Sequence, residues 1–305
     1  MTTSFERFCE LIVANGTAGQ TVQGLSINGL RTSFKLEASN EPHPNNAEIS
    51  IYNLSETSRS KLQKRGVFVQ FKAGYKDNNS ILFSGNVRYV DHVREGADWV
   101  SKMRLGDGEN FYLFDTGRFS FKPGTPTATI IETLASRASN LRGLGNIQQF
   151  LAALPSNMAT YPNGYTSNGT IYSALVTIAA SAGWSLSIQN GVLNFVHHAP
   201  QASDFTEKGE LLSPDTGLIG SPEHGSPCKN NNMNVNSSDK ARKKQAKKNA
   251  LLKVKCLLNP RIKCGGVVQI DSLAVKGSYF VDKLEHTGDT HGGDWYTQLE
   301  VKPLV

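Results

Sequence analysis

The sequence has few cysteines, and the four it has are too scattered to form a disulfide framework. They are Cys9, Cys228, Cys256 and Cys264, and no two are separated by only two residues. Small disulfide-stapled folds and paired-thiolate zinc sites both need more cysteines at closer spacing. We therefore expect free thiols, with Cys256 and Cys264 packed in strands.

Long apolar runs are also absent. No stretch of about 18 apolar residues occurs, so no membrane span is expected. The N-terminal segment MTTSFERFCELIVANG carries Glu6 and Glu10 and lacks the basic start and apolar stretch of a secretory signal peptide. We expect a chain that is made in a cytoplasm and is not exported through a secretory pathway.

The signatures of common enzyme classes are missing as well. The sequence contains no phosphate-binding P-loop, no Gly-x-Ser-x-Gly elbow, no His-Glu-x-x-His zinc motif and no dinucleotide fingerprint. Carboxylates are plentiful, but no pair is marked as a glycosidase pair. Asp107 and Glu109 lie in the segment GDGEN, which we interpret as the end of a strand. We predict no enzymatic activity, no catalytic residue and no cofactor.

One histidine-rich segment resembles a set of metal ligands. His286, Asp289 and His291 crowd into HTGDTH, which is followed by two glycines. A zinc site needs three or four converging ligands and a shell of residues that holds them. These three residues lie instead where a Gly-rich turn joins two strands, so we predict a structural turn and no metal site.

Positive charge is concentrated in one segment. The net charge is +6, but the segment from Asp239 to Lys255 has eight basic residues against one acidic residue, which leaves the rest of the chain at −1. The candidate contact residues for nucleic acid in this segment are Lys240, Arg242, Lys243, Lys244, Lys247 and Lys248. Two interpretations stay open: a solvated loop, or an electrostatic arm that faces nucleic acid or an acidic partner.

Alternation with a period of two residues runs through Asn45–Tyr75. Apolar residues alternate with polar ones in AEISIY, which is typical of a strand with one buried face. Ser55 follows as a helix cap, with Glu56 in the first turn of a short helix. The alternation resumes in VFVQF after Gly66. This strand–helix–strand order is typical of a β-rich domain.

The middle of the chain has helical spacing. Thr125 is predicted to cap a helix with Pro126 at its first position, and Ile147–Leu154 is predicted to be a short helix that ends at Pro155. We expect Asn157–Thr170 to be a polar loop. Thr170 is then predicted to cap a helix over 171–182, and Asn-Gly at 190–191 predicts a tight hairpin.

Together these patterns predict a mainly β chain with an α/β middle module: two tube-like β-barrel domains that flank a small α+β domain. Many short strands with regular turn signals favour barrels. The predicted boundaries are 1–115 for the first barrel, 116–205 for the middle module and 206–305 for the second barrel. The last of these carries a polar and basic insert at about 224–252.

Three consecutive elements resemble the first barrel of bacteriophage tail baseplate hub proteins. The segments that carry the resemblance are NNAEISIYNLS, GVFVQFKAGY and ILFSGNV. Three later segments are similar to the second barrel of the same family: GLIGSPE, LLNPRIKCGGVVQI and GSYFVDKLEHTGDTHGGDWYTQLE. The resemblance covers most of the chain and is weakest in the middle module. The insert between Pro222 and Lys253 departs from the family, because this connection is usually shorter.

The resemblance implies a structural protein of the virion, located in the tail baseplate and assembled in the host cytoplasm. It implies a homotrimeric ring that adapts the sixfold tail tube to the threefold spike and surrounds the channel for genome ejection. The implied partners are tail tube or tube-adaptor proteins, the tail spike, baseplate wedge proteins, the tape measure protein and, transiently, the exiting DNA. Two alternatives stay open at this point: a nucleic-acid-binding protein that acts through the basic 240–255 segment, and an unrecognised cell-wall hydrolase.

Overall fold

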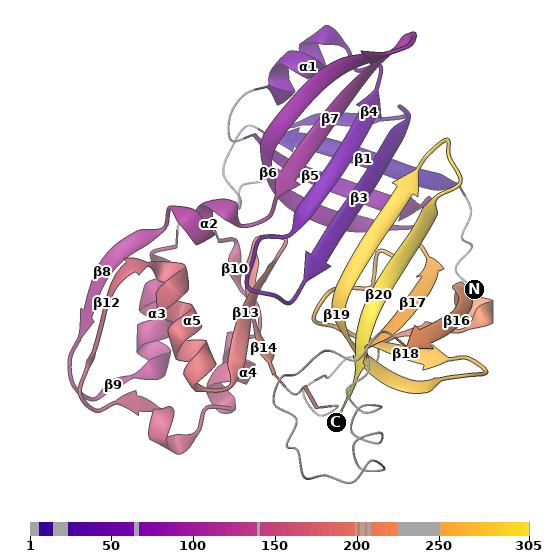
Figure 1. The fold of residues 1–305 in the computed structure, drawn as a ribbon. Helices are drawn as coiled ribbons and strands as arrows, with labels where there is room; N and C mark the ends of the chain where they lie inside the picture. The colour runs from indigo at the N-terminus through magenta and orange to yellow at the C-terminus, as the bar shows by residue number, and fades with distance from the viewer. Residues whose placement is uncertain are drawn as a thin grey trace, which may run out of the picture.

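The computed structural model describes residues 6–14, 24–63, 67–138, 141–198, 200–201, 205, 209–224 and 251–304. We divide these residues into the N-terminal strands, the middle module and the C-terminal strands (Figure 1). The N-terminal strands are β1 (Arg7–Ala14), β2 (Leu25–Asn28), β3 (Thr32–Ser39), β4 (Asn46–Tyr52), β5 (Phe68–Tyr75), β6 (Asn78–Glu95) and β7 (Asp98–Gly106), with helix α1 (Glu56–Leu62) between β4 and β5. The C-terminal strands are β15 (Glu210–Leu212), β16 (Leu218–His224), β17 (Leu252–Leu257), β18 (Val267–Asp271), β19 (Lys276–Asp289) and β20 (Trp295–Pro303), with a 3-10 turn η3 (Pro214–Thr216) before β16.

These strands form a single sheet, although the two sets are far apart in sequence. The sheet has 13 strands, and its main path runs β16-β17-β20-β19-β3-β4-β7-β6-β5-β1-β2, while β15 and β18 pair with each other and β18 also pairs with β19. The predicted mainly β class is confirmed. The difference from the prediction is closure: among the described residues the path does not return on itself, so the sheets are open rather than closed into two barrels.

The middle module forms a separate α/β unit beside the sheet (Figure 1). Its strands are β8 (Thr116–Phe121), β9 (Thr125–Pro126), β10 (Gly143–Leu144), β11 (Thr160–Tyr161), β12 (Tyr165–Thr170), β13 (Trp184–Gln189) and β14 (Val192–His197). Its helices are α2 (Glu109–Leu113), α3 (Thr127–Ser136), α4 (Ile147–Ala152) and α5 (Ile171–Ser181), with a 3-10 turn η1 (Ser156–Met158). The hairpin of β13 and β14 and the cap of α5 agree with the sequence, because the Thr170 hydroxyl accepts the Ser173 N–H at 3.1 Å.

Two local predictions in the middle module are wrong. Thr125 does not cap α3, because its hydroxyl donates to the Lys122 carbonyl and its backbone lies in β9, so Pro126 is the residue that precedes the helix. The predicted polar loop Asn157–Thr170 contains two strands, and β12 pairs with β8 along its whole length. After Tyr165 the side chains of β12 are small and polar, so the strand carries no apolar alternation that would have revealed it.

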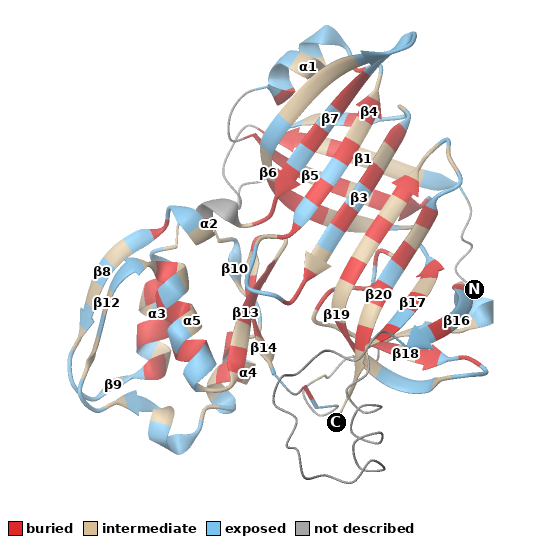
Figure 2. Ribbon diagram, viewed as in Figure 1, coloured by how far each residue is buried: buried red, intermediate tan, exposed pale blue. Residues whose placement is uncertain are grey.

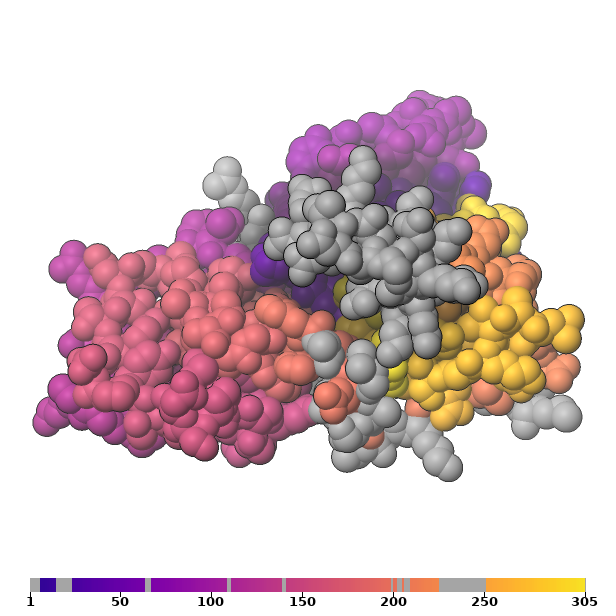
Figure 3. Space-filling view, turned by 60° about the horizontal axis from the view of Figure 1, so that its bottom comes forward, coloured from indigo at the N-terminus to yellow at the C-terminus, as the bar shows by residue number. Residues whose placement is uncertain are grey.

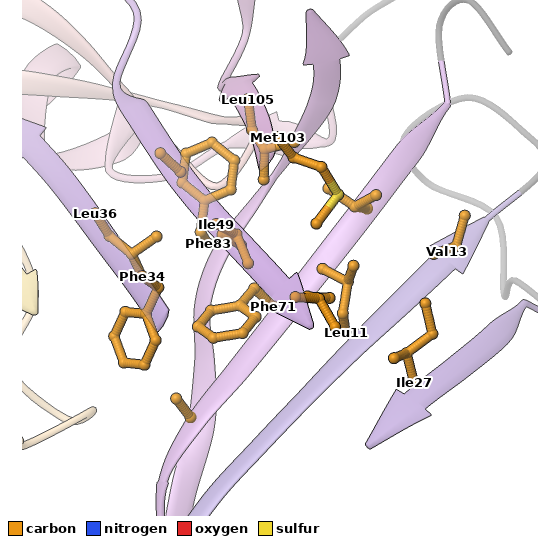
Figure 4. Close-up of a cluster of buried hydrophobic side chains, with 14 of the residues drawn as sticks. Leu11, Val13, Ile27, Phe34, Leu36, Ile49, Phe71, Phe83, Met103 and Leu105 are labelled. Carbon is orange, nitrogen blue, oxygen red and sulfur yellow. The ribbon is translucent and has the colours of Figure 1, made fainter. Parts of the chain in front are cut away.

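The apolar side chains gather in three clusters, one in each part of the chain. Buried and exposed positions alternate along the long strands (Figure 2), as expected for a sheet with one covered face. The cluster of the N-terminal strands surrounds Phe71 and Phe83, with Leu11, Ile49 and Met103 packed beside them (Figure 4). Separate clusters fill the middle module and the C-terminal strands. The division of the chain into three domains, with boundaries near 115 and 205, stays a prediction.

The N-terminal and C-terminal strands are joined where β3 pairs antiparallel with β19. The register runs from Lys283 opposite Ser39 to Asp289 opposite Ser33. Aromatic side chains reinforce this joint, because the ring of Phe34 lies 4.8 Å from Phe71 and 5.4 Å from Trp295 on β20, edge-on in both cases. The Trp295 side chain thus belongs to the core of the N-terminal strands, although it comes from the C-terminal set.

The middle module is attached to the sheet through buried polar groups. Asp107, which follows β7, is 2% exposed and accepts the backbone N–H groups of Asn190 and Gly191 at the tip of the β13–β14 hairpin. Asn190 in turn accepts the N–H of Ser84 at 2.7 Å. Asn45 donates to the Ile188 carbonyl at 2.9 Å. Figure 3 shows the middle module and the C-terminal strands on opposite sides of one face of the molecule.

The contact between Asp107 and the hairpin predicts a pH dependence. Burial raises the pKa of Asp107 to about 7, against the lowering effect of the two backbone N–H groups. At pH values between the ordinary pKa of an aspartate in the unfolded chain and the raised pKa in the folded chain, Asp107 binds more protons in the folded chain. The contribution of this group to the free energy of unfolding is therefore largest at low pH and is lost as the pH rises through about 7. Between about pH 5 and about pH 8 the free energy of unfolding should fall by on the order of 3 kcal/mol through this group.

The test compares urea unfolding of the unchanged protein and of Asp107→Asn at both pH values. The amide side chain of this variant is uncharged at both pH values, so the free energy of unfolding of the variant should change less with pH than that of the unchanged protein. Asp77→Asn, in the exposed β5–β6 turn, is the matched control and should keep the original pH dependence. Equal pH dependence in the unchanged protein and Asp107→Asn would contradict the raised pKa.

The aromatic joint predicts a measurable coupling between the two strand sets. A double-mutant cycle of Phe34→Leu and Trp295→Leu should give an interaction energy of about 0.5–1.5 kcal/mol, as expected for an edge-on aromatic pair. The control cycle pairs Phe34→Leu with Phe150→Leu, because Phe150 lies in the core of the middle module. That cycle should be additive within about 0.5 kcal/mol. Additivity in both cycles would show that the joint does not depend on this pair.

Candidate assembly surface

The three side chains singled out in the HTGDTH segment contact different partners and do not converge on one point. His286 is 2% exposed on the covered face of β19, and its Nδ1 lies 2.8 Å from the Thr297 hydroxyl. Burial lowers the pKa of His286 to about 4. Asp289 points elsewhere, toward Arg31 at 3.0 Å and the N–H of His291 at 2.8 Å. Among the described residues, no three His, Cys, Asp or Glu side chains are grouped so that they could hold a metal ion.

Asp289 has a structural role at the joint between the strand sets. Burial alone would raise the pKa of Asp289, but the Arg31 guanidinium and the His291 N–H outweigh it and hold this pKa below its ordinary value. Arg7 completes the arrangement, because its guanidinium lies over the Trp295 ring at 5.2 Å and donates to the Asp289 carbonyl at 2.6 Å. The turn after β19 is therefore tied to β1 and to the loop before β3.

The cysteines offer no reactive site among the described residues. Cys9, Cys256 and Cys264 are free, and burial raises the pKa of the Cys9 and Cys256 thiols to about 12. A thiol with a raised pKa is a poor nucleophile and a poor metal ligand at neutral pH. Cys256 lies in β17 as predicted, whereas Cys264 lies in the turn before β18. Cys228 lies outside the described residues.

The predicted nucleic-acid contacts also lie outside the described residues. They are Lys240, Arg242, Lys243, Lys244, Lys247 and Lys248. The last basic residues of the same segment are described on β17: Lys253 pairs with Glu300 at 3.6 Å, and the Lys255 ammonium lies 3.7 Å from the centre of the Tyr296 ring. These two lysines are engaged within the sheet.

The face of the sheet that points away from the cores carries charged side chains on neighbouring strands. Glu48 lies opposite Arg104, and Glu300 lies opposite both Lys253 and Lys283. The ion pairs on and beside this face are Arg104–Glu48 (3.2 Å), Lys35–Glu37 (2.7 Å), Lys35–Glu285 (3.2 Å), Lys253–Glu300 (3.6 Å) and Lys283–Glu41. Exposed pairs of this kind contribute at most about 1 kcal/mol each. Their effect is to keep a broad, solvated surface close to neutral.

The two ends of the main sheet path are edge strands. β16 pairs only with β17, and β2 pairs only with β1, so each leaves one row of backbone N–H and C=O groups without a strand partner among the described residues. An open edge is a template for pairing with another chain unless it is protected. β16 carries a register shift between Ile219 and Glu223, and Ile219 itself is 39% exposed. Leu257 on β17 is 37% exposed. This end therefore combines an open edge with exposed apolar side chains.

No described helix has the length and apolar character that a membrane-crossing helix needs. No protein-family model matches the chain. No curated protein sequence matches it either.

Solved structures, in contrast, match the chain along nearly its whole length. The crystal structure of a tail protein from Neisseria meningitidis MC58 superposes with a TM-score of 0.63 at 12% identity, over 98% of this chain and 97% of that one. The 43 kDa tail protein of prophage MuSo2 from Shewanella oneidensis gives 0.61 at 9% identity, over 98% of both chains.

A third match comes from a secretion machine. The c3393 protein of E. coli is a component of the type VI secretion system and is described as similar to the phage T4 tail proteins gp27 and gp5. It gives a TM-score of 0.55 at 10% identity, over 90% of this chain and 74% of that one. At such low identity these likenesses bear on the backbone arrangement alone. The chain has the fold of phage tail baseplate hub proteins.

Proposed function

We propose that the chain is a structural subunit of the baseplate hub in the tail of a phage or phage-like particle. The observation that carries this proposal is the likeness over 97–98% of both chains to two tail proteins. Because the likeness spans all three parts of the chain, each part has a counterpart in those tail proteins. In this role the protein works without catalysis, in the virion, after assembly in the host cytoplasm.

Three copies form a ring in this proposal. Each chain contributes two sets of strands, and three chains give six, which matches the six subunits of the tail tube on one side and a threefold spike on the other. The β3–β19 pairing supports this arrangement, because it joins the edges of two strand sets within one chain. Pairing of the two ends of the main sheet path, β2 and β16, between neighbouring copies would close the ring and cover both of these edges.

The ring surrounds the channel through which the genome leaves. The solvated face of the sheet suits a channel wall, because its lysines and arginines are paired with glutamates across the strands. A wall with compensated charge does not bind phosphates strongly, since affinity for DNA depends on the number of basic groups free to replace counterions. The proposed partners around the ring are tail tube or tube-adaptor proteins, the spike, baseplate wedge proteins and the tape measure protein.

The first test is the mass of the purified protein in solution, by light scattering, alone and with its tail neighbours. A mass three times that of the 33.2 kDa chain is expected. Ile219→Lys should weaken self-association about 10- to 100-fold, because the ring would bury this side chain next to the β16 edge. Leu273→Lys, on the fully exposed β18–β19 turn, is the matched control and should leave the mass unchanged. A monomer under all these conditions would overturn the ring.

The basic residues at 240–248 are proposed to contact the exiting DNA. Replacing Lys240, Arg242, Lys243, Lys244, Lys247 and Lys248 with glutamine should weaken binding of a duplex oligonucleotide. The slope of log K against log salt should fall by about 0.9 for each phosphate that the segment no longer neutralises. The measurement is fluorescence anisotropy at several salt concentrations.

The control for this test replaces Lys253 and Lys255 with glutamine, because both are engaged on β17. This variant should bind DNA like the unchanged protein. A salt slope that is the same in all three proteins would show that the segment does not face DNA.

A further inference from the structure

The tip of the β13–β14 hairpin carries the pair Asn190–Gly191, and an asparagine followed by glycine loses its side-chain amide more readily than other asparagines do. In this reaction the Gly191 nitrogen gives up its proton and bonds to Cγ of Asn190, while the side-chain amide takes up a proton and leaves as ammonia. Water then opens the resulting succinimide ring at either carbonyl and leaves aspartate or isoaspartate. Glycine favours the attack because it has no side chain to hinder its nitrogen.

Both reacting groups are held by hydrogen bonds to residues of the N-terminal part. The N–H of Gly191 donates to Oδ1 of Asp107 at 2.8 Å, and Oδ1 of Asn190 accepts the N–H of Ser84 on β6 at 2.7 Å. Ring closure needs the side chain of Asn190 to rotate toward a free Gly191 nitrogen, so both contacts have to break first. A group held in this way reacts only in the fraction of molecules in which the region has opened.

The hairpin tip also has little room for this rotation. Gly191 is buried, and its carbonyl accepts the N–H of Arg142 at 2.8 Å. The place where a side chain on Gly191 would stand lies 2.9 Å from Cδ of Arg142. The φ angles of Asn190 and Gly191, 55° and 80°, are those of a tight two-residue hairpin turn. The tip is therefore held both by its own module and by the N-terminal strands.

An exposed Asn-Gly pair in the same chain provides the contrast. Asn28 is the last residue of β2, and both Asn28 and Gly29 are exposed. Apart from its chain neighbours, no atom lies within 4 Å of the place where a side chain on Gly29 would stand. The two pairs have the same dipeptide sequence and differ in their contacts, so a difference between their reaction rates reports those contacts.

We propose that Asn190 is a modification site that is closed while the hairpin tip contacts Ser84 and Asp107 and opens when the tip separates from them. The products make the separation permanent. An aspartate brings a second carboxylate to a turn that buried Asp107 already holds, and two carboxylates that share a buried site cannot both ionise without cost. An isoaspartate adds a methylene group to the main chain of a two-residue turn. This site does not depend on the ring proposed above, since all of its contacts lie within one chain.

The test incubates the purified full chain at neutral pH and follows the conversion of amide to acid at each pair by peptide mass spectrometry. Asn190 should convert at least about 10-fold more slowly than Asn28, because only the open fraction reacts. Asp107→Ala removes the acceptor of the Gly191 N–H and should speed conversion of Asn190 about 10-fold, with Asn28 unchanged. Asp77→Ala, in the exposed β5–β6 turn, is the matched control and should change neither rate.

A measurement without any variant covers the case in which Asp107→Ala does not fold, as judged by its thermal melt. In concentrated urea the unchanged protein loses the contacts of both pairs, so Asn190 and Asn28 should convert at similar rates. The ratio of the two rates in the folded and unfolded chain then decides alone.

A second variant tests the effect of the product. Asn190→Asp should speed hydrogen exchange of the Ser84 and Gly191 amides about 10-fold, because the added carboxylate weakens the contact with Asp107. Asn28→Asp is the matched control and should leave this exchange unchanged. Equal conversion of Asn190 and Asn28 in the folded chain would overturn the closed site. Conversion of Asn190 that is no faster in folded Asp107→Ala, or exchange that is unchanged in Asn190→Asp, would overturn the proposal as well.

Discussion

The pairing of β3 with β19 is the constraint on which the rest of the structure depends. It joins strands from opposite ends of the chain and removes two edges that would otherwise be open. It also places Trp295 inside the core of the N-terminal strands and aligns the charged rows of both strand sets on one face. Once this pair is formed, the only ends of the main sheet path among the described residues are β2 and β16. The proposed assembly follows from where those two ends remain.

Features that depend on neighbouring residues could be predicted from the sequence. Ser55 caps α1 by accepting the Ser58 N–H, and Thr170 caps α5 in the same way. Alternation in Asn45–Tyr75 predicts β4 and β5 on either side of α1, because each strand buries one face. The HTGDTH turn is predictable for the same reason: its glycines and strand flanks are local signals.

Features that depend on distant residues could not be predicted in this way. Local alternation shows which face of β3 is buried, but nothing in it identifies a pairing partner some 250 positions later. Local signals therefore predict two separate barrels where the structure has one open sheet. Asp107 is a similar case, because its role is defined by the backbone of a hairpin 83 positions away. The segment GDGEN marks the end of a strand but not what the carboxylate binds.

The two strand sets are joined to each other in a different way from the middle module, and this difference determines which parts of the molecule move together. The two strand sets share ladder hydrogen bonds and an aromatic core, so they should move as one body. The middle module keeps its own apolar core and meets the sheet through Asp107, Asn45 and Asn190, which are polar. Separating such a contact exposes little apolar surface, so it costs less than unfolding either side. In the proposed ring, the two strand sets form the rigid part and the middle module adjusts beside them. The fold is shared with tail proteins at 9–12% identity, which shows that many side-chain sets specify this strand arrangement. What a subunit contacts must then be read from its own exposed edges and cavities.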